Sequence, residues 1–328
     1  MNAIPAPPVF ADVVAAAGRL KGVAVRTPLV ASPVLSELVG GTVFVKPETL
    51  QRTGSFKFRG AYNRMVQIPQ ERRAAGVVAC SSGNHAQGVA AAAKLLGMPA
   101  VIVMPSDAPA MKRERTIALG AEVVDYNRET DDRDAIAGAI AAERNAIFVP
   151  PYDDPNIIAG QGTVGLEIVE DLKALGLAPD IVSANASGGG LIAGISLAVK
   201  ESFPNARVVV AEPAGFDDHA RSFRSGQRER NPAPGGSFCD ALLAPTPGAI
   251  TFEVTRRLVG EGVSATDAEV ARAVAFAFRE LKLVVEPGGA VALTALLEGR
   301  LDAAGKTTVI VLSGGNVDAA TFNACLSA

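Results

Sequence analysis

Short apolar, β-branched runs alternate along the first half of the chain with alanine-rich stretches of helical length. The runs that predict strands are residues 77–79, 100–103, 122–124 and 147–149. The stretches that predict helices are residues 85–96, 111–119 and 134–143. Gly97 and Gly120 stand where the first two helices would end, as glycine commonly does. This alternation predicts a parallel sheet wrapped by helices.

The same alternation resumes after the proline-bearing segment 150–155. Helices are predicted at residues 163–174 and 192–200, and strands at 181–184, 208–211 and 308–312. The predicted strands are almost continuously apolar, which is typical of a sheet covered on both faces. We therefore expect a second α/β unit. Residues 224–237 are rich in Gly, Pro, Arg and Ser and predict a surface loop.

The composition is that of a globular protein with a large core. The chain has 328 residues, of which 48% are hydrophobic, and this length allows two or three domains. The formal net charge is -3, and the basic patch of a nucleic-acid-binding protein is missing. The one notable basic cluster, within residues 221–230, is interrupted by Glu229 and indicates a solvated loop or helix face.

Three cysteines, Cys80, Cys239 and Cys325, stand far apart in the chain. Their odd number and wide spacing fit neither a disulfide framework nor a zinc site, so we expect a reducing, cytoplasmic compartment. Residues 1–10 are uncharged and proline-bearing, unlike a signal peptide. No apolar segment approaches the roughly 20 residues of a membrane span, so we expect no membrane contact.

The first motif that carries chemistry is a lysine between two aromatic residues. Lys57 lies between Phe56 and Phe58, near an expected helix start. Apolar surroundings disfavour the ammonium form, and a neutral amine can form a Schiff base with an aldehyde. A single lysine on a helix is more commonly a solvated surface group, so this motif has meaning only beside others.

Three further motifs follow apolar strands. Residues 81–88, Ser-Ser-Gly-Asn-His-Ala-Gln-Gly, offer short donors and a helix start to a carboxylate, or simply a helix cap. Residues 187–194 hold three consecutive glycines, which let a backbone wrap a phosphate or form a flexible turn. They match neither the Walker loop nor the dinucleotide pattern. Residues 312–318 follow the last strand, at the edge where open α/β sheets bind ligands, or form a turn in which Asp318 caps a helix.

Taken in this order, the four motifs resemble those of the fold-type II pyridoxal-phosphate enzymes, specifically the serine/threonine dehydratase and serine racemase group. The resemblance spans about residues 13–318. It implies an α/β fold of two open, twisted parallel-sheet lobes, like the β subunit of tryptophan synthase. The large lobe would comprise residues 1–52 and 146–328, and a small mobile lobe, residues 53–145, would close over the substrate. A homodimer is also implied.

The resemblance assigns roles to individual residues. Lys57 would hold pyridoxal 5'-phosphate covalently and then move the Cα proton of the substrate, while Phe56 would pack against the pyridine ring. Asn84 would hydrogen-bond the ring hydroxyl. The phosphate would be bound by Ser187, Gly188, Gly189, Gly190 and Leu191. The substrate carboxylate would be bound by Ser81, Ser82, Asn84 and His85.

Ser313 matches the family's partner of the pyridine nitrogen. A neutral hydroxyl cannot hold that nitrogen protonated as an aspartate would, so the ring is a weaker electron sink. Prompt loss of a β-leaving group is then favoured over chemistry that needs a long-lived carbanion. We therefore expect replacement of Ser313 by Asp to impair elimination strongly.

The expected reaction is elimination of water and ammonia from a small β-hydroxy amino acid, giving a 2-oxo acid. Serine, threonine and 3-hydroxyaspartate all remain candidate substrates. A second substrate carboxylate would favour an arginine in the pocket. The candidate arginines are Arg52, Arg59, Arg115, Arg221 and Arg224. Cys239-Asp240-Ala241 replaces the family's more usual Ala-Asp-Gly, which leaves side-chain specificity open.

Other activities remain as alternatives. The first is a serine or aspartate-type racemase, because Ser82 matches the serine that protonates Cα from the opposite face in racemases, which need a proton group on both faces. Tyr152, where that subgroup carries asparagine, disfavours it. The others are a β-replacing synthase and a non-enzymatic ligand-binding α/β protein. The chain ends soon after the Ser313 motif, so we expect no appended amino-acid-sensing domain.

A metal site is also implied by the resemblance. The matching positions are Glu212, the carbonyl of Phe216 and Asp218, an oxygen set that suits Mg²⁺, Mn²⁺ or Ca²⁺. Considered without the family, the same acidic turn would simply cap a helix.

Overall fold

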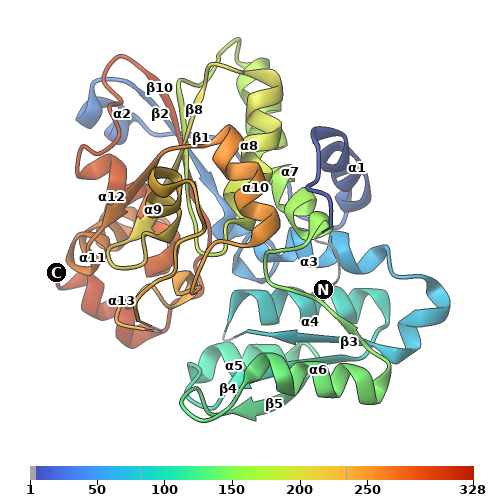
Figure 1. The fold of residues 1–328 in the computed structure, drawn as a ribbon. Coiled ribbons are helices and arrows are strands. Elements are labelled where there is room, and N and C mark those ends of the chain that lie inside the picture. Colours follow the sequence, from blue (N-terminus) through green and yellow to red (C-terminus); the bar gives the residue numbers. More distant parts are fainter. Residues whose placement is uncertain (1–4, 82, 234) are drawn as a thin grey trace.

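The computed structural model of the protein describes residues 5–81, 83–233 and 235–328, and it contains two open sheets flanked by helices (Figure 1). The larger sheet has the order β1-β2-β10-β7-β8-β9 and the smaller one β5-β4-β3-β6. The strands of the larger sheet are β1 (Val30–Ala31), β2 (Thr42–Pro47), β7 (Ile181–Asn185), β8 (Arg207–Pro213), β9 (Gly262–Ala265) and β10 (Thr307–Leu312). The smaller sheet consists of β3 (Val77–Cys80), β4 (Ala100–Pro105), β5 (Glu122–Tyr126) and β6 (Ile147–Phe148). Apart from β1 with β2, the paired strands run parallel, which confirms the predicted fold class.

Helices cover both sheets. Those around the larger sheet are α1 (Phe10–Leu20), α2 (Pro33–Val39), α7 (Pro155–Ala174), α8 (Gly190–Ser202), α9 (Asp218–Ser225), α10 (Ala249–Leu258), α11 (Asp267–Phe276), α12 (Pro287–Leu297) and α13 (Ala319–Leu326). Those around the smaller sheet are α3 (Lys57–Val66), α4 (Asn84–Leu96), α5 (Ala110–Ala118) and α6 (Arg133–Arg144). Short turns of 3-10 helix are η1 (Glu48–Leu50), η2 (Arg52–Gly54), η3 (Gln70–Ala75) and η4 (Asp240–Leu242), and α11 runs on into a π-helical turn at Ala277–Leu281. α3 packs on both α4 and α7, so it joins the two halves of the molecule.

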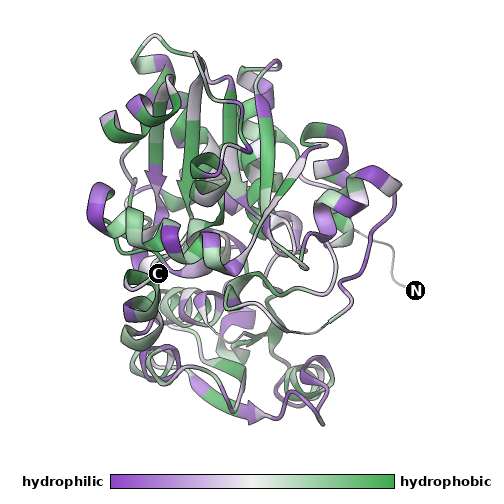
Figure 2. Ribbon diagram, turned by 90° about the vertical axis from the view of Figure 1, so that its left-hand side faces the viewer, coloured by the Kyte–Doolittle hydropathy of each residue, from purple (hydrophilic) through white to green (hydrophobic). Residues whose placement is uncertain are grey.

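The central strands are buried along almost their whole length. In β10, the four consecutive residues 309–312 have no exposed surface, and β3 is buried throughout. Figure 2 shows largely hydrophobic colouring along the strands of the larger sheet, interrupted by hydrophilic segments. The apolar strands therefore belong, as expected, to a sheet that helices cover on both faces.

α7 is longer than the sequence pattern predicted. It begins at Pro155, not at residue 163, because Asp154 accepts hydrogen bonds from the backbone N–H groups of Asn156 and Ile157. Proline at the first helical position needs no N–H donor there, so Pro155 starts the helix instead of prolonging a loop. The prolines of residues 150–155 had favoured a loop through this segment.

Besides the two-residue β1, which was also not predicted, two strands of the larger sheet have no clear signal in the sequence. β9 lies at the edge, and Ala265 is its one fully buried residue. β2 contains a buried lysine, Lys46, which breaks the apolar pattern that would mark an internal strand. Neither strand was predicted, because the edge position and the buried charge are both tertiary properties.

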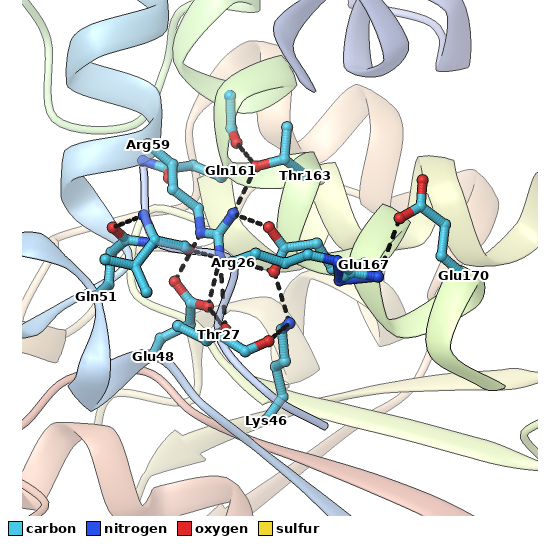
Figure 3. A network of polar contacts seen from close by, with 12 residues as sticks. Arg26, Thr27, Lys46, Glu48, Gln51, Arg59, Gln161, Thr163, Glu167 and Glu170 are labelled. Atoms are coloured by element: carbon cyan, nitrogen blue, oxygen red, sulfur yellow. Dashed lines mark hydrogen bonds and ion pairs between the residues drawn. The ribbon is translucent and has the colours of Figure 1, made fainter. Parts of the chain in front are cut away.

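Lys46 belongs to a buried ion-pair network that lies beneath α3 (Figure 3). The Arg59 guanidinium pairs with Glu48 at 2.8 Å and with Glu167 at 2.7 Å. The Lys46 ammonium pairs with Glu167 at 2.6 Å and donates to the carbonyl of Thr27. The network ties α3 to β2, to α7 and to the N-terminal segment, and so fixes the position of the helix that starts at Lys57.

The chain crosses between the two sheets near the predicted lobe boundary. β6 pairs with β3 in the smaller sheet, although it lies just beyond residue 145, the predicted end of the small lobe. The lobe boundaries themselves stay a prediction. Within the described ranges, no helix has both the length and the apolar character needed to cross a bilayer.

Candidate active site

A cleft with a volume of about 780 Å³ lies where the two halves of the molecule meet. All four sequence motifs line it, represented by Lys57, Asn84, Gly189 and Ser313. Three of them directly follow the carboxyl ends of β3, β7 and β10, the edge at which parallel sheets bind ligands. The fold therefore brings together motifs that are up to 256 residues apart, from position 57 to position 313.

Lys57 is the first residue of α3 and points into this cleft. Its amine donates a hydrogen bond to the carbonyl of Pro151 at 2.8 Å and lies 5.3 Å from the centre of the Phe56 ring. Burial lowers the pKa of the Lys57 amine to about 8, against the opposing influence of the Glu286 carboxylate. A substantial fraction of this amine is therefore neutral near pH 8. Pro151, which holds it, was not singled out in the sequence.

The triple-glycine turn is held in place by its carbonyl oxygens. The Gly188 carbonyl accepts hydrogen bonds from the Thr251 hydroxyl at 2.6 Å and from the Gly248 N–H at 3.1 Å. A Cβ atom on Gly188 would lie 2.2 Å from the Tyr152 ring, and Gly189 has a φ of 94°, which favours glycine. α8 starts at Gly190 without a side-chain cap from the described residues. Its first N–H groups are thus available to an anion such as a phosphate.

The turn after β3 is fixed by polar contacts across the cleft. Asn84 donates to the carboxylate of Glu286 and accepts from the amide of Asn316. The His85 ring donates to the carbonyl of Val149 at 3.0 Å, and burial, aided by Lys57, lowers the pKa of His85 to about 3. His85 is therefore neutral. It lines the cleft together with Ser81, whereas the predicted Ser82 lies outside the described residues.

Ser313 is 3% exposed and lies against the segment that carries Lys57. Its carbonyl accepts a hydrogen bond from the Phe56 N–H at 3.1 Å. Neighbouring Gly314 forms a β-bridge with Ser55. The predicted partner of the pyridine nitrogen thus contacts the residue that precedes Lys57, and both Ser313 and Lys57 line the same cleft.

Two further residues of the cleft have buried polar atoms without a partner among the described residues. These atoms are Oδ1 of Asn185 and Nε2 of Gln161. A buried polar atom without a partner costs about 1–3 kcal/mol, so both favour a polar ligand in the cleft. The sequence analysis missed them. Asn185 did carry a signal, since it ends β7 just as Ser81 follows β3 and Ser313 follows β10.

None of the five candidate arginines lines the cleft. Arg59 lies in the buried network, Arg115 donates to Asn316, and Arg52 donates to the carbonyl of Val23. Arg221 and Arg224 lie on α9 beside Asp217.

The cations that do line the cleft besides Lys57 are Lys112, Arg128 and Arg133. The Lys112 ammonium lies 2.7 Å from Asp240 and 3.6 Å from Glu286. Arg128 lies 2.8 Å from Asp107, whereas the ion pair of Arg133 with Asp134 is 3.8 Å long. Arg133 is therefore the cation of the cleft least engaged by a protein carboxylate. Its side chain carried no distinguishing signal in the sequence.

Away from the cleft, buried side chains gather after β8. Ligand atoms of Glu212, Asp218 and His219 lie within 4.8 Å of one another, and all three side chains are buried. Burial and the charge of Asp218 raise the pKa of Glu212 well above its usual range, and burial raises the pKa of Asp218 to about 6. The structure thus brings together the two predicted carboxylate ligands. Phe216 is buried in the turn before them, and its carbonyl stays a predicted ligand.

Comparison with known proteins agrees with this geometry. A family model described as "Pyridoxal-phosphate dependent enzyme" matches residues 20–314. The L-threonine ammonia-lyase of Thermotoga maritima is 43% identical over 307 residues, covering 94% of this chain and 75% of that one. The L-threo-3-hydroxyaspartate ammonia-lyase of Saccharomyces cerevisiae is 38% identical over 320 residues, covering 98% and 97%. The solved structure of maize serine racemase has a TM-score of 0.91 at 34% identity, covering 98% of this chain and 97% of that one.

Proposed function

This chain belongs to the family of pyridoxal-phosphate-dependent enzymes, and from that premise we propose that it eliminates water and ammonia from a small β-hydroxy amino acid. The products are a 2-oxo acid and ammonia. The observation that carries the proposal is the meeting of three groups in one cleft: the Lys57 amine, the triple-glycine turn and Ser313. Relatives named as ammonia-lyases, and one named as a threonine dehydratase, support elimination as the main reaction.

The residues present fit pyridoxal phosphate. A glycine turn that would not accommodate a Cβ at Gly188 leads into an uncapped helix start, and unpartnered polar atoms of Asn185 and Gln161 line the same cleft. Lys57 would hold the aldehyde, residues 187–191 the phosphate, and Ser313 the pyridine nitrogen. When bound, the cofactor supplies an electron sink for the charge left when Cα loses its proton.

The protein residues then have defined tasks. Ser81, Ser82, Asn84 and His85 are proposed to hold the substrate carboxylate. The neutral Lys57 amine takes the Cα proton, and the hydrogen bond to the Pro151 carbonyl keeps that amine in the cleft. The β-hydroxyl takes up one proton and leaves as water, which balances the proton removed from Cα. Hydrolysis of the released enamine then consumes one water and frees ammonia. Ser313, being neutral, holds the pyridine nitrogen without adding positive charge, which favours departure of the β-hydroxyl.

The substrate class is tested directly by release of 2-oxo acid. Serine, threonine and each stereoisomer of 3-hydroxyaspartate should be assayed with the wild type and with Lys57→Ala. We expect turnover of at least one substrate by the wild type, none by Lys57→Ala, and a visible absorption band that only the wild type shows. A colourless wild-type protein that takes up no cofactor would instead be a non-enzymatic ligand-binding protein.

Arg133 bears on the choice among these substrates. It is the cleft cation least engaged by a carboxylate, so it is available to a second substrate carboxylate. If 3-hydroxyaspartate is the substrate, Arg133→Met should raise its KM while leaving the KM of serine nearly unchanged. Equal effects on both substrates would exclude this role.

A racemase activity is the second candidate, because the maize serine racemase structure is so similar. Racemisation requires a proton group on each face of the cofactor, and Ser82 is proposed for the face opposite Lys57. Tyr152, whose ring packs on the glycine turn, occupies the position at which racemases carry asparagine. Chiral analysis of recovered substrate separates the two activities.

The proposal includes a divalent cation, Mg²⁺, Mn²⁺ or Ca²⁺, held by Glu212, the Phe216 carbonyl and Asp218. It is supported by the two buried carboxylates, since Oδ2 of Asp218 has no partner among the described residues. A chelator should lower activity, and addition of the ion should restore it.

A homodimer in the cytoplasm completes the proposal. Three free, buried cysteines support a reducing compartment, and light scattering measures the mass.

A further inference from the structure

His219 stands beside the proposed cation site with one ring nitrogen already used. Its Nε2 lies 3.0 Å from the carbonyl oxygen of Ser187, the first residue of the glycine turn. A carbonyl oxygen can only accept, so Nε2 carries the hydrogen and, in the neutral ring, Nδ1 carries a lone pair. Nδ1 is buried and has no partner among the described residues. Nδ1, with its free lone pair, is thus the atom that His219 can offer to a ligand.

The same cluster contains a second residue with an unpartnered polar atom, Asp218. His219 is fully buried and Asp218 is 1% exposed, and Oδ2 of Asp218 accepts no hydrogen bond from the described residues. Each Glu212 oxygen accepts one backbone N–H, from His219 at 2.9 Å and from Ala220 at 3.0 Å, which leaves further lone pairs. One ligand atom from each of the three side chains lies within 4.8 Å of the other two, and Nδ1 is the His219 nitrogen still free to bind an ion, because Nε2 donates to Ser187.

We propose that His219 is itself a metal ligand, through Nδ1, and that it makes the site one for a transition-metal ion rather than for Mg²⁺ or Ca²⁺. The inference rests on the cation site of the proposed function and deepens it. Carboxylate and carbonyl oxygens alone suit Mg²⁺, Ca²⁺ and Mn²⁺, whereas an imidazole shifts the preference toward the transition metals. Affinity should then rise from Mn²⁺ to Co²⁺, and Mg²⁺ should bind most weakly.

The same imidazole joins the ion to the cofactor-binding turn. A histidine bound to a metal commonly donates its other N–H to a backbone carbonyl, which fixes the orientation of the ring. Here that carbonyl belongs to Ser187. The path from the ion to the glycine turn is thus a single side chain, and its hydrogen bond should strengthen when the metal polarises the ring. Bound metal should therefore slow dissociation of the cofactor.

A spectroscopic experiment on the cofactor-loaded enzyme tests the ligand directly. The chain contains two histidines, His85 and His219, and His85 is held in the cleft by Val149. Pulsed electron paramagnetic resonance of bound Mn²⁺ detects a directly coordinated nitrogen, and labelling the histidines with ¹⁵N identifies it as imidazole. We expect a histidine nitrogen signal in the wild type and its loss in His219→Asn, which places an amide oxygen where Nδ1 stood.

Metal titrations of the same proteins provide the second measurement. In His219→Asn, the affinity for Co²⁺ should fall by about 10- to 100-fold, whereas the affinity for Mg²⁺ should change little. Asp217→Asn is the matched control. The substitution removes a neighbouring negative charge, but Asp217 pairs with Arg221 and lies outside the cluster. It should keep both the metal preference and the nitrogen signal. Circular dichroism confirms that each variant is folded.

Three results would overturn the inference. If Mn²⁺ binds without a histidine nitrogen signal, or if His219→Asn keeps the preference for Co²⁺, a water molecule and not a metal satisfies Nδ1. If the wild type binds none of the three ions, the cation site fails together with the inference. Release of 2-oxo acid by the same metal-free preparation then shows that elimination itself stands, so the two failures can be told apart.

Discussion

At the scale of single residues, the chemistry depends on what the fold does to one amine. Lys57 is identifiable in the sequence by its aromatic neighbours, but its low pKa results from burial in a cleft formed by distant segments. The hydrogen bond to the Pro151 carbonyl holds the amine without giving it a charged partner. This arrangement favours a neutral, nucleophilic lysine.

A pH dependence follows for capture of the cofactor by the cofactor-free protein. Only the neutral Lys57 amine attacks an aldehyde, so the rate should rise about tenfold per pH unit below pH 8 and level off above about 8. Stopped-flow absorbance at the wavelength of the lysine adduct measures it. A rate that keeps rising toward pH 10.5, the ordinary pKa of lysine, would contradict a lowered pKa.

Ser313 is the residue that we propose to decide the reaction type. Replacement by Asp would place a carboxylate against the pyridine nitrogen, at a position that is 3% exposed. Protonation of the ring should stabilise the carbanion and lower the kcat of elimination by about tenfold or more. Ser313→Ala serves as the control, since it removes the hydroxyl without adding charge. Undiminished kcat in Ser313→Asp would remove this explanation.

At the scale of elements, the glycine turn shows how backbone geometry forms a binding site. Gly188 lies so close to the Tyr152 ring that no Cβ fits, and the positive φ of Gly189 adds a second constraint. The turn is held by the side chains of Thr251 and His219, which come from α10 and α9. The motif is local in sequence, but its conformation is supported by helices that follow much later.

Gly188→Ala should therefore weaken cofactor binding. The Tyr152 ring must move away from the turn, and phosphate contacts made by the backbone are lost with it; removal of such positioning typically costs about 10- to 100-fold in affinity. Gly138→Ala in α6 is the matched control, because a Cβ there meets no atom within 4 Å. Equilibrium titration with pyridoxal phosphate compares the two. Equal affinities would show that Tyr152 yields without disturbing the turn.

Arg59 shows how an ion pair between elements contributes to the stability of the folded protein. Arg59→Met would leave the carboxylate of Glu48, which has no exposed surface, without its cation, at a cost of about 3–5 kcal/mol. Arg144→Met breaks an ion pair with Glu122 whose side chains are 43% and 50% exposed, and should cost less than about 1 kcal/mol. Urea denaturation of both variants measures the difference. Similar losses would mean that the buried network contributes no more than a surface pair.

At the scale of the whole molecule, the cleft is spanned by contacts between the two sheets and their helices. Lys112 of α5 reaches Asp240 and Glu286, which belong to the part of the chain that forms the larger sheet. Asn84 at the start of α4 also reaches Glu286. Glu286 is buried, and burial raises its pKa to about 7 against the influence of Lys112. These contacts join the two halves of the molecule beside the cleft, which Asn84, Lys112 and Asp240 line.

Loss of the Lys112 side chain should lower the free energy of unfolding more than loss of the charge on Asp240, its more exposed partner. Lys112→Met leaves the buried Glu286 without its ion-pair partner and should destabilise the protein by about 3–5 kcal/mol. Asp240→Asn should cost less than about 1 kcal/mol, because the Asp240 side chain is 39% exposed and Lys112 retains Glu286. Urea denaturation distinguishes the two variants. A larger loss in Asp240→Asn would contradict this ranking.

The sequence by itself determined the α/β class, most strand positions and the chemistry-bearing turns around Lys57, Gly188 and Ser313. These features are local, because apolar runs, glycines and motif order are written within a few consecutive residues. Only the tertiary structure placed Arg133 in the cleft, left the five arginines considered first outside its lining and brought His219 beside two buried carboxylates. The physical reason is that burial, pairing and the partners of a side chain depend on segments distant in the chain.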